Sequence, residues 1–193
     1  PVVMFDRVTN DILCDKVIID DQSAAYEAVQ SLIDKGRKKI ALVTTVDYVS
    51  VGKLRTDGYI KALLDNGISF DENLIIKIED IDTCEITIGK LLEDKAIDAV
   101  FAVNELFAVT IIKTANKIGL NVPKDLAVIA FTDGMISKYS TPTITTVSQN
   151  GIKMGNKSAK MLIERLESEE NEEDENYKTE IIETHLIERE STN

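Results

Sequence analysis

The segment from residue 97 to residue 133, IDAVFAVNELFAVTIIKTANKIGLNVPKDLAVIAFTD, constrains the fold more than any other part of the chain. It opens with a short apolar run, Ala99–Val103, which is typical of a strand buried on both faces of a parallel sheet. Apolar residues at helical spacing follow, and a second apolar run, Leu126–Phe131, ends at Thr132 and Asp133. A strand, a helix and a strand in this order predict a right-handed βαβ unit.

Turn and capping signals mark the ends of these elements. Asn104 follows the first apolar run and is a natural N-cap, because its side-chain oxygen can accept a hydrogen bond from the first helical turn. Gly119 is expected to end the helix. In open parallel sheets, ligands bind beyond the carboxyl ends of the strands. Asn104, Thr132 and Asp133 are therefore the first candidates for binding residues, although turn chemistry alone would also explain each of them.

Similar strand and helix patterns precede this segment. Apolar runs that predict strands start near residues 40 and 74, and helical patterns follow them at residues 50–66 and 82–93. An earlier helix is expected from about Gln22, with Gly36 as its stop. The sequence therefore predicts the α/β class with a doubly wound parallel sheet.

The pattern changes after Asp133. A strand-like run at Ile144–Val147, a helix from about Gly151 and a closing strand at about Thr179–Ile187 lie outside the regular series. Between the helix and the closing strand, the run ESEENEEDEN at residues 167–176 predicts an exposed acidic linker.

This change predicts two lobes of unequal completeness. Residues 21–133, with residues 179–193 returning to them, are expected to form one complete lobe. Residues 1–20 and 134–178 are expected to form the crossovers and an incomplete second lobe. Because the chain starts with PVVMFDR, inside an apparent strand, we expect it to be part of a longer protein.

Composition argues against several functions. The net charge is −12 and the basic residues are dispersed, whereas binding to duplex DNA requires clustered Lys and Arg. Two distant cysteines, Cys14 and Cys84, and one histidine, His185, argue against a disulfide framework, a zinc site or a catalytic triad. A reducing, cytoplasmic location fits this cysteine usage. No apolar run is long enough to span a membrane, and we expect no cofactor and no metal.

The roles of three charged residues remain open. Asp20–Asp21 at a strand end could hold Mg²⁺, but a helix N-cap and a first-turn acid explain the pair better. Arg55 lies in the opening turns of a predicted helix and could form a forked contact to ligand oxygens, or it could be an ordinary surface arginine. If Arg55 binds a ligand, Arg55→Ala is expected to leave the stability of the ligand-free chain almost unchanged, because an arginine in a ligand cleft supports little of the core.

Seven segments in register resemble the lactose-repressor/galactose-repressor family. In chain order they are PVVMFDRV, KGRKKIALV, GKLRTDGYIKAL, DAVFAVNELFA, VPKDLAVIAFTD, TPTITTVSQNGIKMGNKSAKMLIERL and HLIERES. The resemblance implies a core like the type I periplasmic sugar-binding proteins, with two α/β lobes and the effector bound between them. It also implies an N-terminal helix-turn-helix head, which this sequence lacks together with the early part of the first lobe.

The resemblance implies roles for particular residues. Arg55 would be the effector-binding arginine of the family's R-x-x-G-Y pattern, Asn104 the cleft asparagine, and Asp6 a contact from the other lobe. The chain departs from the family at two positions. Glu105 stands where the family usually has aspartate, and Thr132 stands where it usually has the aspartate that contacts sugar hydroxyls. Asp133 is the candidate to replace that second aspartate.

The expected function is that of the effector-binding and dimerisation core of a bacterial transcription regulator, not an enzyme. A small polar effector, a sugar or a related metabolite, would shift the lobe orientation of a homodimer and so control DNA binding through the missing head. The chain itself would bind neither operator DNA nor a membrane. The alternative is a solute-binding protein of a sugar transport system, which would share the lobes and lack the head.

Overall fold

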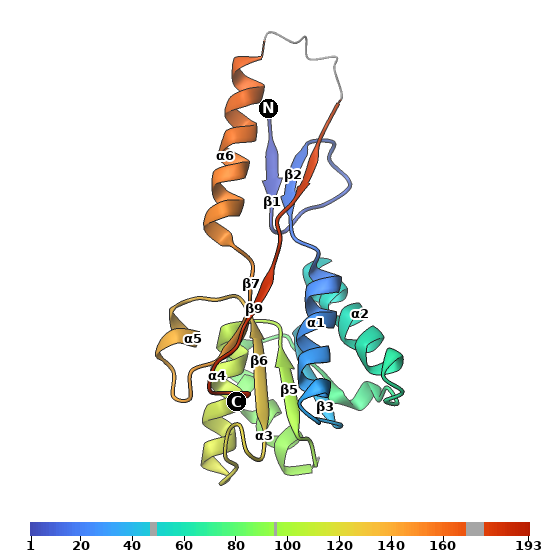
Figure 1. Ribbon diagram of the computed structural model, residues 1–193, viewed down its shortest axis with the longest axis vertical. Helices are drawn as coiled ribbons and strands as arrows, with labels where there is room; N and C mark the ends of the chain where they lie inside the picture. Colours follow the sequence, from blue (N-terminus) through green and yellow to red (C-terminus); the bar gives the residue numbers. More distant parts are fainter. Residues whose placement is uncertain (47–49, 95, 169–175) are drawn as a thin grey trace. The chain divides into compact units, whose positions relative to one another are not determined.

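A computed structural model describes residues 1–46, 50–94, 96–168 and 176–193 of the chain (Figure 1). The chain divides into two units, each built from two separate stretches of sequence. Unit 1 consists of residues 1–20 and 149–184, and unit 2 consists of residues 21–148 and 185–193. No helix in these described ranges is long and apolar enough to cross a membrane.

Unit 2 is built on a six-stranded sheet with the strand order β4-β3-β5-β6-β7-β9. Its strands are β3 (Ile40–Thr45), β4 (Ile75–Ile78), β5 (Ala99–Ala102), β6 (Ala127–Phe131), β7 (Thr145–Ser148) and β9 (His185–Ile187). All neighbouring pairs are parallel except β7 and β9, which run antiparallel. The predicted doubly wound α/β sheet is confirmed, with an antiparallel strand added at one edge.

Helices cover both faces of this sheet. They are α1 (Asp21–Asp34), α2 (Ser50–Asp65), α3 (Ile81–Asp94), α4 (Glu105–Lys117) and the short α5 (Met135–Tyr139), with a 3₁₀ turn η1 (Glu72–Leu74) before β4. Helices α1 and α2 pack together on one face, and α3 and α4 pack together on the other (Figure 1). Every residue of β5 and β6 is buried, which explains why these strands read as unbroken apolar runs.

The local signals in the sequence are confirmed. Asn104 caps α4, since its Oδ1 accepts a hydrogen bond from the Phe107 amide at 2.8 Å. The two glycines expected to stop helices, Gly36 and Gly119, both have a φ of 85°, and Gly67, which follows α2, has a φ of 69°. This left-handed conformation is the usual way to end a helix, and only glycine adopts it without strain.

Unit 1 contains a parallel three-stranded sheet of order β1-β2-β8 with one helix. Its elements are β1 (Val3–Phe5), β2 (Asp15–Ile18), β8 (Thr179–Ile181) and α6 (Gly151–Glu167). A forked ion pair joins α6 to β2, because Arg165 donates from Nε and Nη2 to the two oxygens of the buried Asp15 at 2.7 and 3.0 Å. The hydrogen bonds from Arg165 lower the pKa of Asp15 and outweigh the opposing effect of burial.

The structure differs from the sequence-based expectation near the C-terminus. The single closing strand expected at Thr179–Ile187 is wrong, because it is two strands, β8 in unit 1 and β9 in unit 2. Residues 134–148 lie in unit 2, where β7 pairs with β6, whereas the expectation gives residues 134–178 to the crossovers and the incomplete lobe. Most of the expected acidic linker, residues 169–175, lies outside the described residues.

Candidate functional site

The strand order of unit 2 creates a place for a ligand at the carboxyl ends of β3 and β5. From β3 the chain first moves to β4 on one side of the sheet and then returns to β5 on the other side. Such a reversal is where ligands bind in open α/β sheets. β5 and β6 are neighbours, with Ala102 opposite Ala130. Asn104 and Thr132, which follow these two strands, are therefore brought to the same edge of the sheet.

Arg55 reaches this edge from α2. Its Nη1 donates to the carbonyl oxygen of Val103 at 2.8 Å, and its Cζ lies 3.7 Å from the ring centroid of Phe131. Its guanidinium group therefore spans the ends of β5 and β6, next to the residues that precede Asn104 and Thr132. Only 6% of Arg55 is exposed, so the alternative of an ordinary surface arginine is wrong.

Asp21 is the ionic partner of Arg55. Arg55 Nε donates to Asp21 Oδ1 at 2.7 Å, and both side chains are buried. The pair joins α2 to the first turn of α1 and compensates the charge of each partner, which a buried ion requires. The preferred interpretation of Asp21 as a first-turn acid is confirmed. In the described part of the chain, no group of three or more His, Cys, Asp or Glu side chains is arranged to hold a metal ion.

The rest of the R-x-x-G-Y pattern holds α2 in place. A Cβ atom at Gly58 would lie 2.3 Å from the carbonyl oxygen of Gln22, so α1 and α2 approach too closely for any other residue. The hydroxyl of the buried Tyr59 donates to the carbonyl oxygen of Ile40 at 2.8 Å, and burial raises the pKa of Tyr59. Arg55 is thus presented by a helix that is fixed to both α1 and β3.

Asn104 can bind a ligand and cap α4 at the same time. Its Oδ1 is used by the Phe107 amide, while none of the residues described in the structure accepts a hydrogen bond from its Nδ2. The side chain is only partly buried. Capping therefore does not use up its hydrogen-bonding capacity, since Nδ2 still offers two donors.

Thr132 adopts a strained conformation at the end of β6. Its φ is 75°, which is rare for a β-branched residue, and its side chain is exposed. Its backbone N–H donates to the carbonyl oxygen of Val147 at 3.0 Å. Strained backbone of this kind is retained mainly where function requires it.

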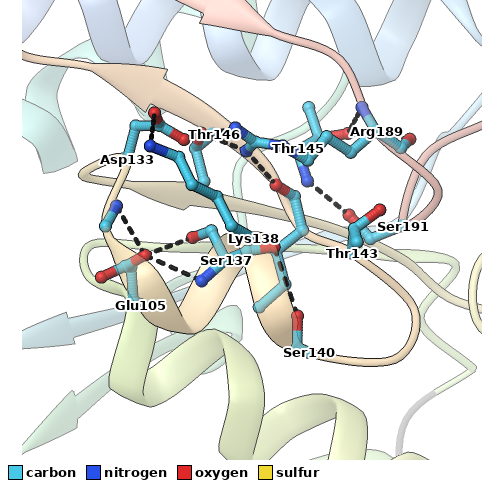
Figure 2. A network of polar contacts seen from close by, with 12 residues as sticks. Glu105, Asp133, Ser137, Lys138, Ser140, Thr143, Thr145, Thr146, Arg189 and Ser191 are labelled. Carbon is cyan, nitrogen blue, oxygen red and sulfur yellow. Dashed lines mark hydrogen bonds and ion pairs between the residues drawn. The ribbon is translucent and has the colours of Figure 1, made fainter.

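Asp133 faces a polar network instead (Figure 2). Its Oδ1 receives Arg189 Nη2 at 2.5 Å and Thr146 Oγ1 at 3.1 Å, and its Oδ2 lies 3.2 Å from Lys138 Nζ. Burial raises its pKa, but the hydrogen bonds from Arg189, Lys138 and Thr146 outweigh burial and hold the pKa below 3.8. Asp133 therefore supports the fold, which does not favour the expectation that it replaces the family's aspartate as a ligand contact.

Asp6 lies in unit 1 and has surroundings of its own. It follows β1 with a φ of 60°, another left-handed conformation in a non-glycine residue. Its Oδ1 accepts a hydrogen bond from Gln149 Nε2 at 3.3 Å, and 40% of its side chain is exposed. The four other candidates, Arg55, Asn104, Thr132 and Asp133, all lie in unit 2.

Sequence reasoning missed the contacts made by Glu105, which it noted only as a departure from the family. Glu105 Oε1 accepts hydrogen bonds from Gly134 N, Ser137 N and Ser137 Oγ at 2.7, 2.9 and 2.5 Å (Figure 2). It also missed Phe131 under Arg55 and Arg189 beside Asp133. These contacts join residues far apart in the chain, so no local pattern reveals them.

The chain is similar in sequence to known transcriptional regulators. The model of the periplasmic binding protein-like domain matches residues 29–192. The HTH-type transcriptional regulator MalR of Clostridium butyricum is 39% identical over 177 residues, which cover 90% of this chain and 51% of that protein. The HTH-type transcriptional regulator CelR of Thermobifida fusca is 31% identical over 177 residues, covering 91% and 51%. The chain thus spans about half the length of these relatives.

Solved structures agree with the sequence matches. A complex of the transcriptional regulator CelR with cellobiose superimposes with a TM-score of 0.89 at 30% identity, covering 99% of this chain and 58% of that one. The transcription regulator CcpA of Lactococcus lactis gives a TM-score of 0.88 at 28% identity, covering 100% and 70%.

Proposed function

The chain belongs to the periplasmic-binding-protein-like domain family and corresponds to the effector-binding core of LacI-type transcriptional regulators, and from this premise we propose that it senses a small polar effector. The effector class that fits best is a sugar or a related metabolite. Neither a cofactor nor a catalytic step is part of the proposal, since the matched relatives are regulators and not enzymes.

One observation carries the proposal. The guanidinium group of Arg55 contacts Val103 and Phe131, and so brings together the ends of two strands that continue into Asn104 and Thr132. Arg55 and Asn104 offer hydrogen-bond donors and Thr132 offers a hydroxyl group at the carboxyl edge of the sheet. Neutral hydroxyl and ether oxygens of a sugar are suitable partners for them. We propose that Arg55, Asn104 and Thr132 contact the effector and that Asp133 supports Thr132.

The regulatory step is proposed for the full-length protein. The effector would stabilise one lobe orientation, and a helix-turn-helix head of the kind named in the relatives would respond by binding or releasing DNA. A ligand shifts such an equilibrium only through its different affinities for the two states, typically by ~1–3 kcal/mol. Control of DNA binding would place the protein in the cytoplasm. A transport solute-binding protein remains the alternative, but the matched relatives do not favour it.

We further propose that unit 2 forms a homodimer through α4 and α5. These helices pack together and expose large apolar side chains, with exposed fractions of 46% for Leu106, 69% for Met135 and 77% for Tyr139. Soluble monomers rarely expose large contiguous apolar patches, and a two-fold interface would cover the same patch on both subunits.

Calorimetric titration with a panel of neutral mono- and disaccharides that includes cellobiose tests the proposal. We expect saturable binding of at least one sugar, and a loss of roughly 1–3 kcal/mol in Asn104→Ala, because a ligand oxygen then loses its donor. Asn73→Ala is the matched control, since the Asn73 side chain donates a hydrogen bond to Asp71 in the η1 turn. Absence of saturable binding to every sugar would contradict the proposed effector class.

A further inference from the structure

The turn between β6 and α5 is held from two sides. On one side, Asp133 is bound by Arg189 and Lys138. On the other side, the carboxylate of Glu105 receives the backbone N–H groups of Gly134 and Ser137 and the Ser137 hydroxyl. Both anchors are drawn in Figure 2. Thr132, whose left-handed backbone is costly, lies just before these anchors.

Glu105 is placed to connect two parts of the candidate site. It directly follows Asn104, which caps α4, and it is the first residue of that helix. Its carboxylate reaches the first turn of α5, where it accepts a hydrogen bond from the backbone N–H of Ser137. Charge-assisted hydrogen bonds of this kind are stronger than neutral ones, and three of them converge on one oxygen.

Gly134 gives independent evidence that the carboxylate of Glu105 is packed against this turn. A Cβ atom at Gly134 would lie 2.3 Å from Glu105 Oε2. The space that a side chain would need is therefore filled by the carboxylate of Glu105. Because the colliding atom ends a flexible side chain, Gly134→Ala would displace the carboxylate without breaking the sheet.

We propose that Glu105 is a positioning residue for effector recognition, which holds the Thr132–Gly134 turn in the conformation that the effector contacts. Glu105 itself does not touch the effector. This inference rests on the proposed function, because it assigns Thr132 to the effector site. It adds that the position of Thr132 depends on Glu105, which is the residue next to Asn104. The two proposed effector contacts, Asn104 and Thr132, are therefore held in place relative to each other.

The test compares Glu105→Ala with Glu105→Gln and with Asp98→Ala. The probe is cellobiose or another sugar of the panel that binds the wild type. Because Gln keeps an oxygen acceptor at the end of the side chain, we expect the affinity of Glu105→Gln for this sugar to stay within about threefold of wild type. We expect Glu105→Ala to lose at least about tenfold. Asp98 is the matched control, because its carboxylate accepts the amides of Lys38 and Lys39 at 2.8 and 3.0 Å at the opposite end of β5. Asp98→Ala should keep wild-type affinity.

Amide hydrogen exchange separates positioning from general stability. We expect Glu105→Ala to exchange faster at residues 132–137 than elsewhere in unit 2. Gly134→Ala should reproduce this effect and the affinity loss, and should add little in the Glu105→Ala background, because both changes remove the same contact.

The exchange and affinity measurements together test the positioning role of Glu105. Faster exchange in the turn together with weaker binding supports the inference. Unchanged exchange in the turn, or an affinity loss no greater than that of Asp98→Ala, overturns the positioning role while leaving the proposed function intact. Absence of sugar binding by the wild-type chain overturns the proposed function and, with it, the inference that depends on it.

Discussion

Arg55 and Asp21 form a buried ion pair, with Arg55 Nε 2.7 Å from Asp21 Oδ1, that joins the second turn of α2 to the first residue of α1. Arg55 thus does two things at once, since the same guanidinium group also lies at the strand ends where the effector is proposed to bind. The sequence-based expectation that Arg55→Ala leaves stability almost unchanged is therefore not favoured. Removing one partner of a buried pair leaves the other charge uncompensated.

We expect Arg55→Ala to lower the free energy of unfolding by about 3–5 kcal/mol, because the Asp21 carboxylate stays buried without its partner. Urea unfolding followed by circular dichroism measures this. Replacing both partners by apolar residues, as in Arg55→Met with Asp21→Leu, should recover much of the loss and still bind no effector. An unchanged unfolding midpoint in Arg55→Ala would show that the pair does not support the fold.

Gly58→Ala should destabilise the chain by roughly 1–3 kcal/mol, because its Cβ would meet the Gln22 carbonyl oxygen at 2.3 Å and force α1 and α2 apart. Gly155→Ala is the matched control. Gly155 is also inside a helix, but nothing lies within 4 Å of its Cβ position. There the same substitution should stabilise by about 0.5–1 kcal/mol through helix propensity. Thermal unfolding of both variants checks the expected opposite signs.

Thr132→Ala and Asp133→Ala should separate effector contact from support. We expect Thr132→Ala to weaken sugar binding by about 1 kcal/mol with little loss of stability, since its side chain is exposed. Asp133→Ala should mainly lower stability, because Arg189 loses its carboxylate partner. Calorimetric titration and urea unfolding of the same samples distinguish the two effects. If Asp133→Ala lost more sugar affinity than Thr132→Ala and kept wild-type stability, this would restore the expectation that Asp133 replaces the family's aspartate.

The Asp133 network predicts an acid-dependent contribution to stability. The folded-state pKa of Asp133 is held below 3.8, so this carboxylate contributes stability that is present above that value and lost as the pH falls through the lower folded-state pKa. Asp133→Asn should therefore be less stable than wild type at neutral pH, and the difference should shrink below about pH 4. Lys138→Met, which removes only one partner of the carboxylate, should show a smaller effect. Urea unfolding from pH 7 to pH 3 gives the comparison.

The proposed dimer predicts that a charge on α5 separates the subunits. Tyr139→Asp should shift the chain from dimer to monomer at tens of micromolar, because the proposed interface would have to bury an unpaired carboxylate. Sedimentation equilibrium measures the change. Leu64→Asp is the control, since Leu64 at the end of α2 is 58% exposed and lies on a different helix pair. A monomeric wild type, or an equal shift in both variants, would contradict an interface at α4 and α5.

The sequence by itself determined the features that depend on neighbouring residues. Apolar runs marked β5 and β6, Asn104 marked the start of α4, and Gly119 its end, because strand burial, capping and left-handed backbone each act over a few residues. The edge of the sheet that carries Asn104 and Thr132 followed from the same patterns. The family resemblance added Arg55, whose spacing alone was ambiguous.

Only the tertiary structure decided what those residues contact. Asp21 lies 34 positions before Arg55, and Arg189 lies 56 positions after Asp133, so their pairing depends on how helices and strands pack. The same packing split the expected closing strand into β8 and β9, because each half pairs with a different sheet. Ion pairs between residues so far apart in the chain produce no local periodic pattern in the sequence. Burial and charge compensation determine which residues pair once the sheets have formed.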